Sequence, residues 1–136
     1  MKPRLLRPFA AAAAVFVLVT ASAAALKLDP RAVRGLSKLD PDMRLEQVCD
    51  MEAMARIRQD RTFLPDRAKS NIFSRPIHHG DTMTAEGAAF RSRDKWYRFS
   101  FTCTGTPDHL NIVKFSYKLG SEIPKSRWAD LALWGE

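Results

Sequence analysis

The segment Phe90–Cys103, with the sequence FRSRDKWYRFSFTC, limits what this chain can fold into more than any other segment does. From Lys95 onward, its side chains alternate with the period of two that is typical of a half-buried β-strand. One side carries three aromatic residues and a cysteine: Tyr97, Phe99, Phe101 and Cys103. The other side carries Trp96, Arg98, Ser100 and Thr102. Because burial of each large apolar side chain contributes about 1.5–3 kcal/mol, we expect the rest of the chain to cover the aromatic side.

Two neighbouring segments predict further strands. Thr82–Phe90 combines small residues with a glycine, which is typical of a strand with a bulge or a close backbone approach. Leu110–Leu119 alternates again and places four apolar residues on one face: Val113, Phe115, Tyr117 and Leu119. The segments between and before these strands are rich in turn-forming residues: His78–Asp81, Arg91–Asp94 and Thr104–Asp108. Together the three strands predict an antiparallel meander.

A long helix is expected before these strands. The triplet Asp40-Pro41-Asp42 provides a capping aspartate, a proline at the first helical position and an acid in the first turn. Met43–Gln59 follows without glycine or proline, and its apolar side chains share one broad helical face: Leu45, Val48, Cys49, Ala53 and Ile57. We therefore predict an α+β fold, in which one main helix packs on a three- to four-stranded antiparallel sheet.

Two connecting segments have no clear periodicity. Leu26–Leu39 contains Pro30 and Gly35, which predicts a linker or a frayed lead-in before a single domain over residues 40–136. Arg61–Ile77 contains two prolines, which predicts an irregular connection with room for one helical turn after Pro65.

The end of the chain predicts a short helix or an extended cover over Pro124–Trp134. Its apolar residues Trp128, Leu131 and Trp134 recur three positions apart. Trp96 points away from the aromatic side of its strand, so the C-terminal segment either covers Trp96 or leaves it exposed. If Trp96 is covered, the sheet has an apolar layer on each face.

The N-terminus has the pattern of a secretory signal peptide over residues 1–25. Three basic residues precede the apolar run Phe9–Val19, and two Ala-x-Ala sites follow it at residues 21–23 and 23–25. The alternative is an N-terminal membrane anchor, for which the run is shorter than the ~20 residues that span a bilayer. We expect a periplasmic or secreted protein, not an integral membrane protein, with a mature N-terminus at Ala24 or Leu26.

The two cysteines, Cys49 and Cys103, predict one disulfide. Export places them in an oxidising compartment, and only one intramolecular pairing is possible. A reactive thiol pair or two metal ligands are the alternatives, which a separation of 54 positions without a CxxC motif disfavours. If the helix and the central strand turn both cysteines inward, the disulfide links the helix to the sheet.

No catalytic, metal-binding or cofactor-binding residue is predicted. His78, His79 and His109 lack a chelating spacing and are expected to be exposed turn residues. The serines have no GxSxG-like context. The helical acids are expected to form surface ion pairs, Asp50 with Arg58 and Glu52 with Arg56.

Basic residues are the stronger indication of a binding surface. The full chain has a formal net charge of +7, of which the signal segment contributes three positive charges. The candidate surface consists of residues from the long connection and the central hairpin: Arg67, Lys69, Arg75, Arg91, Arg93, Lys95, Trp96 and Arg98. For an exported protein, anionic envelope material is a more suitable partner than nucleic acid. The alternative is a solvated surface that keeps a small exported domain soluble.

Most of the chain resembles one known family. The blocks LDPDMRLEQVCDMEAMARI, PDRAKSNIFS and GAAFRSRDKWYRFSFTCTGTPDHLNIVKFSYKLGSEIP, with the closing pattern W-x-x-L-x-L-W, are similar to the domain of unknown function 930 family of small exported proteins from Gram-negative bacteria. The resemblance covers Leu39–Trp134 and implies export. It implies no activity, cofactor or catalytic residue, and it fits the position of both cysteines within the strongest blocks.

Three hypotheses for function follow. The first is a non-enzymatic periplasmic binding or accessory module for anionic envelope material. The second is a cell-envelope enzyme or enzyme regulator, which predicts a concave pocket with titratable groups whose pKa values are displaced. The third is a structural protein–protein interaction module, which predicts an exposed apolar patch near Trp96 or Trp128.

Overall fold

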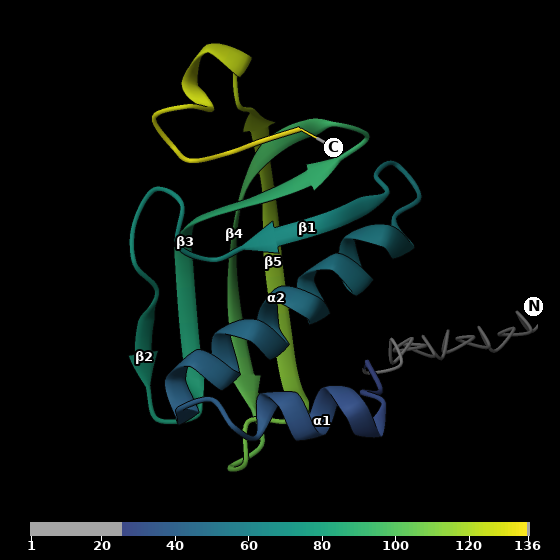
Figure 1. Ribbon diagram of the computed structural model, residues 1–136, viewed down its shortest axis with the longest axis vertical. Helices are drawn as coiled ribbons and strands as arrows, with labels where there is room; N and C mark the ends of the chain where they lie inside the picture. Colours follow the sequence, from purple (N-terminus) through teal and green to yellow (C-terminus); the bar gives the residue numbers. More distant parts are fainter. Residues whose placement is uncertain (1–25, 136) are drawn as a thin grey trace, which may run out of the picture.

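A long helix lies across one face of a five-stranded antiparallel sheet in the computed structural model, which describes residues 26–135 (Figure 1). The elements, in chain order, are α1 (Pro30–Leu36), α2 (Pro41–Gln59), β1 (Pro65–Lys69), β2 (Ile77–His79), β3 (Thr82–Ser92), β4 (Lys95–Gly105), β5 (Ile112–Glu122) and the 3₁₀ helix η1 (Lys125–Arg127). The predicted α+β class and the β3–β4–β5 meander are confirmed. The predicted signal peptide, residues 1–25, lies outside the described residues.

Two short strands extend the meander along the outer edge of β3. The sheet has the order β1-β3-β4-β5, and β2 also pairs with β3. β1 pairs with the second half of β3 and β2 with the first half. The prediction of an irregular connection over 61–77, with room for one helical turn after Pro65, was therefore wrong, because a strand begins at Pro65. Pro65 opens β1, a position that a proline tolerates in an edge strand because the strand has a partner on one side only.

The segment between β1 and β2 packs against a bulge in β3. The β3–β4 register shifts between Ala85 and Ala88. At the bulge, the backbone N–H groups of Ile72 and Phe73 both donate to the Gly87 carbonyl oxygen, at 3.0 and 2.8 Å. A Cβ atom on Gly87 would lie 2.3 Å from the backbone nitrogen of Ser74. The expected bulge and close backbone approach are both confirmed.

The start and the buried face of α2 follow the sequence pattern. The Asp40 side chain accepts a hydrogen bond from the Met43 N–H at 3.1 Å, and Pro41 occupies the first turn. The predicted apolar face is buried. Cys49 in α2 and Cys103 in β4 form the predicted disulfide, with their Cα atoms 6.1 Å apart. The cross-link therefore joins the helix to the centre of the sheet.

Two acids of α2 are buried, although we expected both to lie in surface ion pairs. Glu52 does pair with Arg56, at 2.7 Å, but its side chain is almost fully buried. Asp50 is 8 % exposed and is not paired with Arg58. The Arg58 guanidinium instead donates to the carbonyl oxygen of Pro65 in β1.

The lead-in contains a helix that the sequence analysis missed. Asp29 caps α1 by accepting from the Ala32 N–H at 2.9 Å, and Pro30 begins the helix. This is the same signal that begins α2, but we gave more weight to Pro30 and Gly35 as helix-breaking residues. No residue of α1 is buried. The Arg44 guanidinium holds its end by donating to carbonyl oxygens of the α1–α2 connection.

An apolar layer covers each face of the sheet. The layer under α2 contains the aromatic side of β4 and the disulfide. The second layer, on the other face, consists of Ala89, Trp96, Ile123, Trp128 and Leu133. In β5, Phe115, Tyr117 and Leu119 pack against the first layer as expected, but Val113 is 67 % exposed. A register shift opposite residues 112–114 gives the inward position to Ile112 instead.

Candidate functional site

The C-terminal segment folds over the second apolar layer and determines which tryptophan reaches the surface. Trp96 is fully buried, and its Nε1–H donates to the Trp134 carbonyl oxygen at 2.8 Å. Trp128 is 9 % exposed, and its Nε1–H donates to the Ile123 carbonyl oxygen at 3.1 Å. Trp96 therefore cannot be the exposed aromatic of the candidate surface, because the C-terminal segment covers it.

Arg91 also lies inside the molecule. It is 5 % exposed, and its guanidinium binds both carboxylate oxygens of Asp66, at 2.9 and 2.6 Å. The same group donates to the carbonyl oxygens of Trp134 and Gly135, at 3.3 and 2.8 Å. Arg91 thus ties the C-terminal segment to β1 and β3 and is not part of an exposed basic surface.

Trp134 is the exposed aromatic at this place. It is 44 % exposed, and its ring meets the Trp96 ring edge to face, with centroids 6.2 Å apart. Two predicted cations of β1 lie over the Trp134 ring: the Lys69 Nζ at 4.6 Å and the Arg67 guanidinium carbon at 5.8 Å from its centroid. We call Trp134, Arg67 and Lys69 the Trp134 platform.

The β3–β4 turn adjoins this platform. Arg93 and Asp94 have φ angles of 51° and 62°, as a two-residue type I′ hairpin turn requires. A Cβ atom placed on Gly135 would lie 2.7 Å from Asp94 Oδ1, so the turn lies beside the residue that follows Trp134. Arg93 and Lys95, both exposed, therefore add positive charge near the platform.

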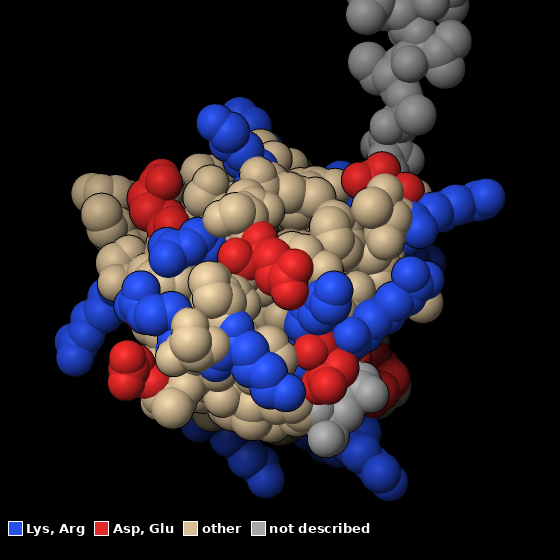
Figure 2. All heavy atoms as spheres, turned by 90° about the horizontal axis from the view of Figure 1, so that it is seen from above, with Lys and Arg blue, Asp and Glu red and all other residues tan. Residues whose placement is uncertain are grey.

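The other two predicted cations lie elsewhere. The Arg98 guanidinium stacks on the Phe73 ring, 3.7 Å from its centroid. Arg75 lies in the β1–β2 connection and lines a depression beside α2. Figure 2, which views the C-terminal end of the molecule, shows Lys and Arg side chains interspersed with Asp and Glu. The predicted residues thus do not form one continuous basic patch.

The sequence analysis missed Trp134 as a surface residue. Its spacing from Trp128 and Leu131 suggested one packed helical face. The structure has only the short η1 there, and the chain after it turns so that Leu133 points inward and Trp134 outward. Ala132, between Leu131 and Leu133, has a φ angle of 52°, a backbone conformation that no residue pattern in this segment indicated.

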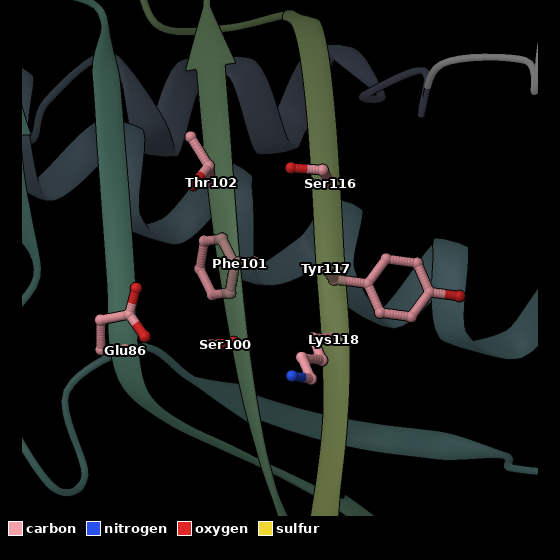
Figure 3. A pocket seen from close by; sticks show the side chains of 7 residues that line it. All are labelled: Glu86, Ser100, Phe101, Thr102, Ser116, Tyr117 and Lys118. Carbon is pink, nitrogen blue, oxygen red and sulfur yellow. The ribbon is translucent and has the colours of Figure 1, made fainter.

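The uncovered part of the sheet has an open, polar surface. Figure 3 shows Glu86, Ser100, Thr102, Ser116 and Lys118 on the face of β3, β4 and β5 that points away from α2. The depression between them has a volume of about 200 Å³. It is a shallow solvated surface.

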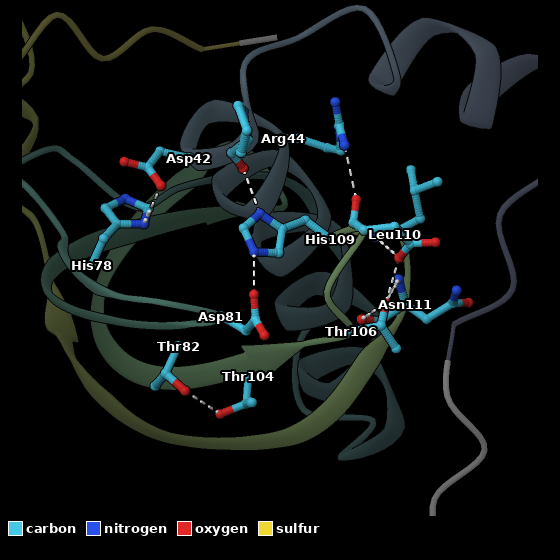
Figure 4. Close-up of polar contacts among 12 residues, drawn as sticks. Asp42, Arg44, His78, Asp81, Thr82, Thr104, Thr106, His109, Leu110 and Asn111 are labelled. Atoms are coloured by element: carbon cyan, nitrogen blue, oxygen red, sulfur yellow. Dashed lines mark hydrogen bonds and ion pairs between the residues drawn. The ribbon is translucent and has the colours of Figure 1, made fainter.

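Two histidines have structural partners, contrary to the expectation of exposed turn residues. His109 is 5 % exposed, and its ring nitrogens contact the Pro41 carbonyl oxygen at 2.7 Å and Asp81 Oδ1 at 2.9 Å (Figure 4). His78 Nε2 lies 2.9 Å from Glu46 Oε1. Within residues 26–135, no group of three or more His, Cys, Asp or Glu side chains is arranged to hold a metal ion.

Comparison with known proteins identifies the family. Within the described residues, no helix is long and apolar enough to cross a membrane. No curated protein matches the chain, and no solved structure does. Residues 36–133 match the family described as Domain of Unknown Function (DUF930), in agreement with the resemblance in the sequence blocks, and the chain belongs to this family.

Proposed function

We propose that the protein is an exported, non-enzymatic binding module that recognises anionic groups of the cell envelope through the Trp134 platform. The observation that carries this proposal is a half-exposed aromatic ring with two cations over it. Arg67 and Lys69 supply positive charge for a phosphate or carboxylate, and the ring supplies a flat apolar surface for the adjoining part of the ligand. Arg93 and Lys95 extend the positive charge at one side.

Buried groups hold the platform segment in place. The carbonyl oxygen of Trp134 accepts hydrogen bonds from Trp96 and Arg91, which are both buried, and the Trp134 ring packs on the Trp96 ring. Arg91 is fixed in turn by Asp66. Because these contacts order the segment in the free protein, binding costs less side-chain and backbone entropy.

The proposed location depends on the N-terminal pattern and is tested separately. We expect the mass of the protein purified from the periplasm or the medium to correspond to a chain that begins at Ala24 or Leu26. The mass after alkylation should also show that both cysteines are protected until reductant and denaturant are added. An intact N-terminus on protein recovered from the cytoplasm would contradict export.

Co-sedimentation tests the platform. We expect the mature protein to pellet with phosphatidylcholine vesicles that contain about 30 % phosphatidylglycerol or with insoluble peptidoglycan, and not with pure phosphatidylcholine vesicles. The first two arms distinguish phosphates of lipid from carboxylates of the cell wall. Trp134→Ala should weaken this binding about three- to tenfold, because the exposed cation–π contacts by which the ring positions Lys69 and Arg67 are worth about 1 kcal/mol.

Val113→Ala is the matched control, because it removes another exposed apolar side chain from β5, at the opposite edge of the sheet. It should bind like the wild type. Circular dichroism in the near ultraviolet and the melting temperature show whether Trp134→Ala still folds. A folded Trp134→Ala variant that binds like the wild type would contradict the proposal, and so would a wild-type protein that pellets with neither anionic material.

A further inference from the structure

A cleft separates α2 from the end of β1 and the β1–β2 connection, and two cations of the Trp134 platform, Arg67 and Lys69, lie at its edge. It consists of two depressions of about 290 and 400 Å³, which share Glu46 and Asn71 as lining residues. The α2 wall carries three acids at intervals of four residues: Asp42, Glu46 and Asp50. Because a helix rises about 1.5 Å per residue, neighbouring acids lie about 6 Å apart along the helix axis. The opposite wall carries three cations, Arg67, Lys69 and Arg75, together with Ser70 and His78.

Asp50 lies in this cleft with an incomplete set of hydrogen bonds. It is 8 % exposed, and its Oδ1 has no hydrogen-bond partner. Burial raises the pKa of the Asp50 carboxyl well above its usual range, and the charge of Glu46 adds to the increase. Hydrogen bonds from Ser70 and the charge of Lys69 partly oppose it. A positively charged group brought to this carboxyl would offset the cost of its ionisation.

A second incompletely bonded atom faces the same acids. His78 lies beside Glu46, but its buried Nδ1 has no hydrogen-bond partner and is 3.7 Å from Asp42 Oδ1. Such atoms are uncommon inside folded proteins, and each is a place where a ligand can supply the missing partner. Asp50 lines the smaller depression and His78 the larger one, and Glu46 lines both.

The opposite wall offers a cation. Arg75 is exposed and forms no ion pair within the described part of the chain, although its neighbours across the cleft are acidic. A guanidinium in this position can bind a carboxylate with two parallel hydrogen bonds. The amide of Asn71, which lines both depressions, adds a further donor.

From this arrangement we propose that the cleft binds a small zwitterion, such as a free amino acid or the ends of a short peptide, with its ammonium group at Asp50 and Glu46 and its carboxylate at Arg75. Opposite charges on the two walls match the two ends of such a molecule. The smaller depression shares Arg67 and Lys69 with the Trp134 platform, but the zwitterion is proposed to bind at Asp50, Glu46 and Arg75, so neither proposal depends on the other.

Titration calorimetry with three related probes tests this proposal. L-alanine carries both charges, its methyl ester only the ammonium group, and N-acetyl-L-alanine only the carboxylate. We expect L-alanine to bind at least ten times more tightly than either blocked form. Asp50→Asn should weaken L-alanine and the ester at least tenfold, whereas Arg75→Gln should weaken L-alanine and the N-acetyl form.

The proton balance gives an independent readout. An ammonium group favours the ionised form of Asp50, so its binding should release a proton, and the heat of binding should depend on the ionisation enthalpy of the buffer. Asp50→Asn should remove this dependence. Glu86→Gln and Arg127→Gln, at exposed sites outside the cleft, are matched controls and should bind like the wild type.

Three results would overturn the proposal: no binding of L-alanine at millimolar concentration, equal affinity for L-alanine and its N-acetyl form, or unchanged affinity in a folded Asp50→Asn variant. Because Asp50→Asn preserves the size of the side chain and removes a destabilising charge, we expect it to fold. Amide NMR spectra of the variant without ligand show, before the titration, whether it is folded.

Discussion

The Asp50 carboxyl makes the stability of the folded protein depend on pH. Its pKa is raised well above the usual value of 3.8, chiefly by burial, while Ser70 and Lys69 limit the increase. An acid with a higher pKa in the folded chain holds its proton more tightly there than in the unfolded chain. The folded state therefore loses stability as the pH rises from the unfolded value through the raised value, and above the raised value the loss is complete.

Replacing this acid should remove the loss. We expect the free energy of unfolding of the wild type, minus that of Asp50→Asn, to become more negative as the pH rises from about 4 to about 8. Urea titrations at several pH values measure this difference. Glu86→Gln is the control for the loss of one exposed carboxylate. A wild-type minus Asp50→Asn difference that is constant or increases with pH would contradict the burial argument.

At the scale of elements, the bulge in β3 explains why β1 and β2 can share one edge of that strand. The chain leaves the sheet after β1, crosses the bulge at Gly87 and returns as β2. The two N–H groups that donate to the Gly87 carbonyl hold this crossing segment, and Ser74 lies against the Gly87 backbone with no space for a side chain.

A methyl group at Gly87 should therefore destabilise the protein. Gly87→Ala places a carbon 2.3 Å from the Ser74 nitrogen, so the crossing segment must move. We expect the free energy of unfolding to fall by about 1–3 kcal/mol or more, as for other overpacked positions. Gly35→Ala is the matched control, because nothing lies within 4 Å of its new Cβ. Equal denaturation midpoints for the two variants would show that the crossing segment is not tightly packed on the bulge.

The elements that could be predicted from the sequence are those in which the pattern of apolar and polar side chains reflects burial. β4 and α2 could be predicted because alternation, capping and a continuous apolar face reflect burial directly. β1 and β2 could not be predicted in this way, since short edge strands are held by backbone bonds to β3 and bury few side chains. Val113 was misplaced for a related reason: the register shift in β5 changes which residue points inward, and no single residue marks it.

At the scale of the whole molecule, the C-terminal segment converts a sheet with one covered face into a three-layer structure and creates the candidate site. The sequence indicated that a second apolar layer was possible, and it identified the cations of the long connection and the central hairpin. It could not show which of these cations meet, because Arg67, Lys69 and Trp134 come together only through the pairing of β1 with β3 and the path of the C-terminus. We predicted that Arg91 and Trp96 form part of the exposed surface. Both are instead buried and donate hydrogen bonds to the Trp134 carbonyl oxygen, which fixes the segment that carries the exposed ring.

Charge reversal at the platform is the most direct test of the proposed function. Arg67→Glu with Lys69→Glu should abolish co-sedimentation with the anionic material that the wild type binds. Lys114→Glu with Lys118→Glu, which makes the same change in net charge on β5 at the opposite edge of the sheet, should reduce it only slightly. If the two double variants lose binding equally, net charge and not the Trp134 platform governs the interaction, and the proposed site is wrong.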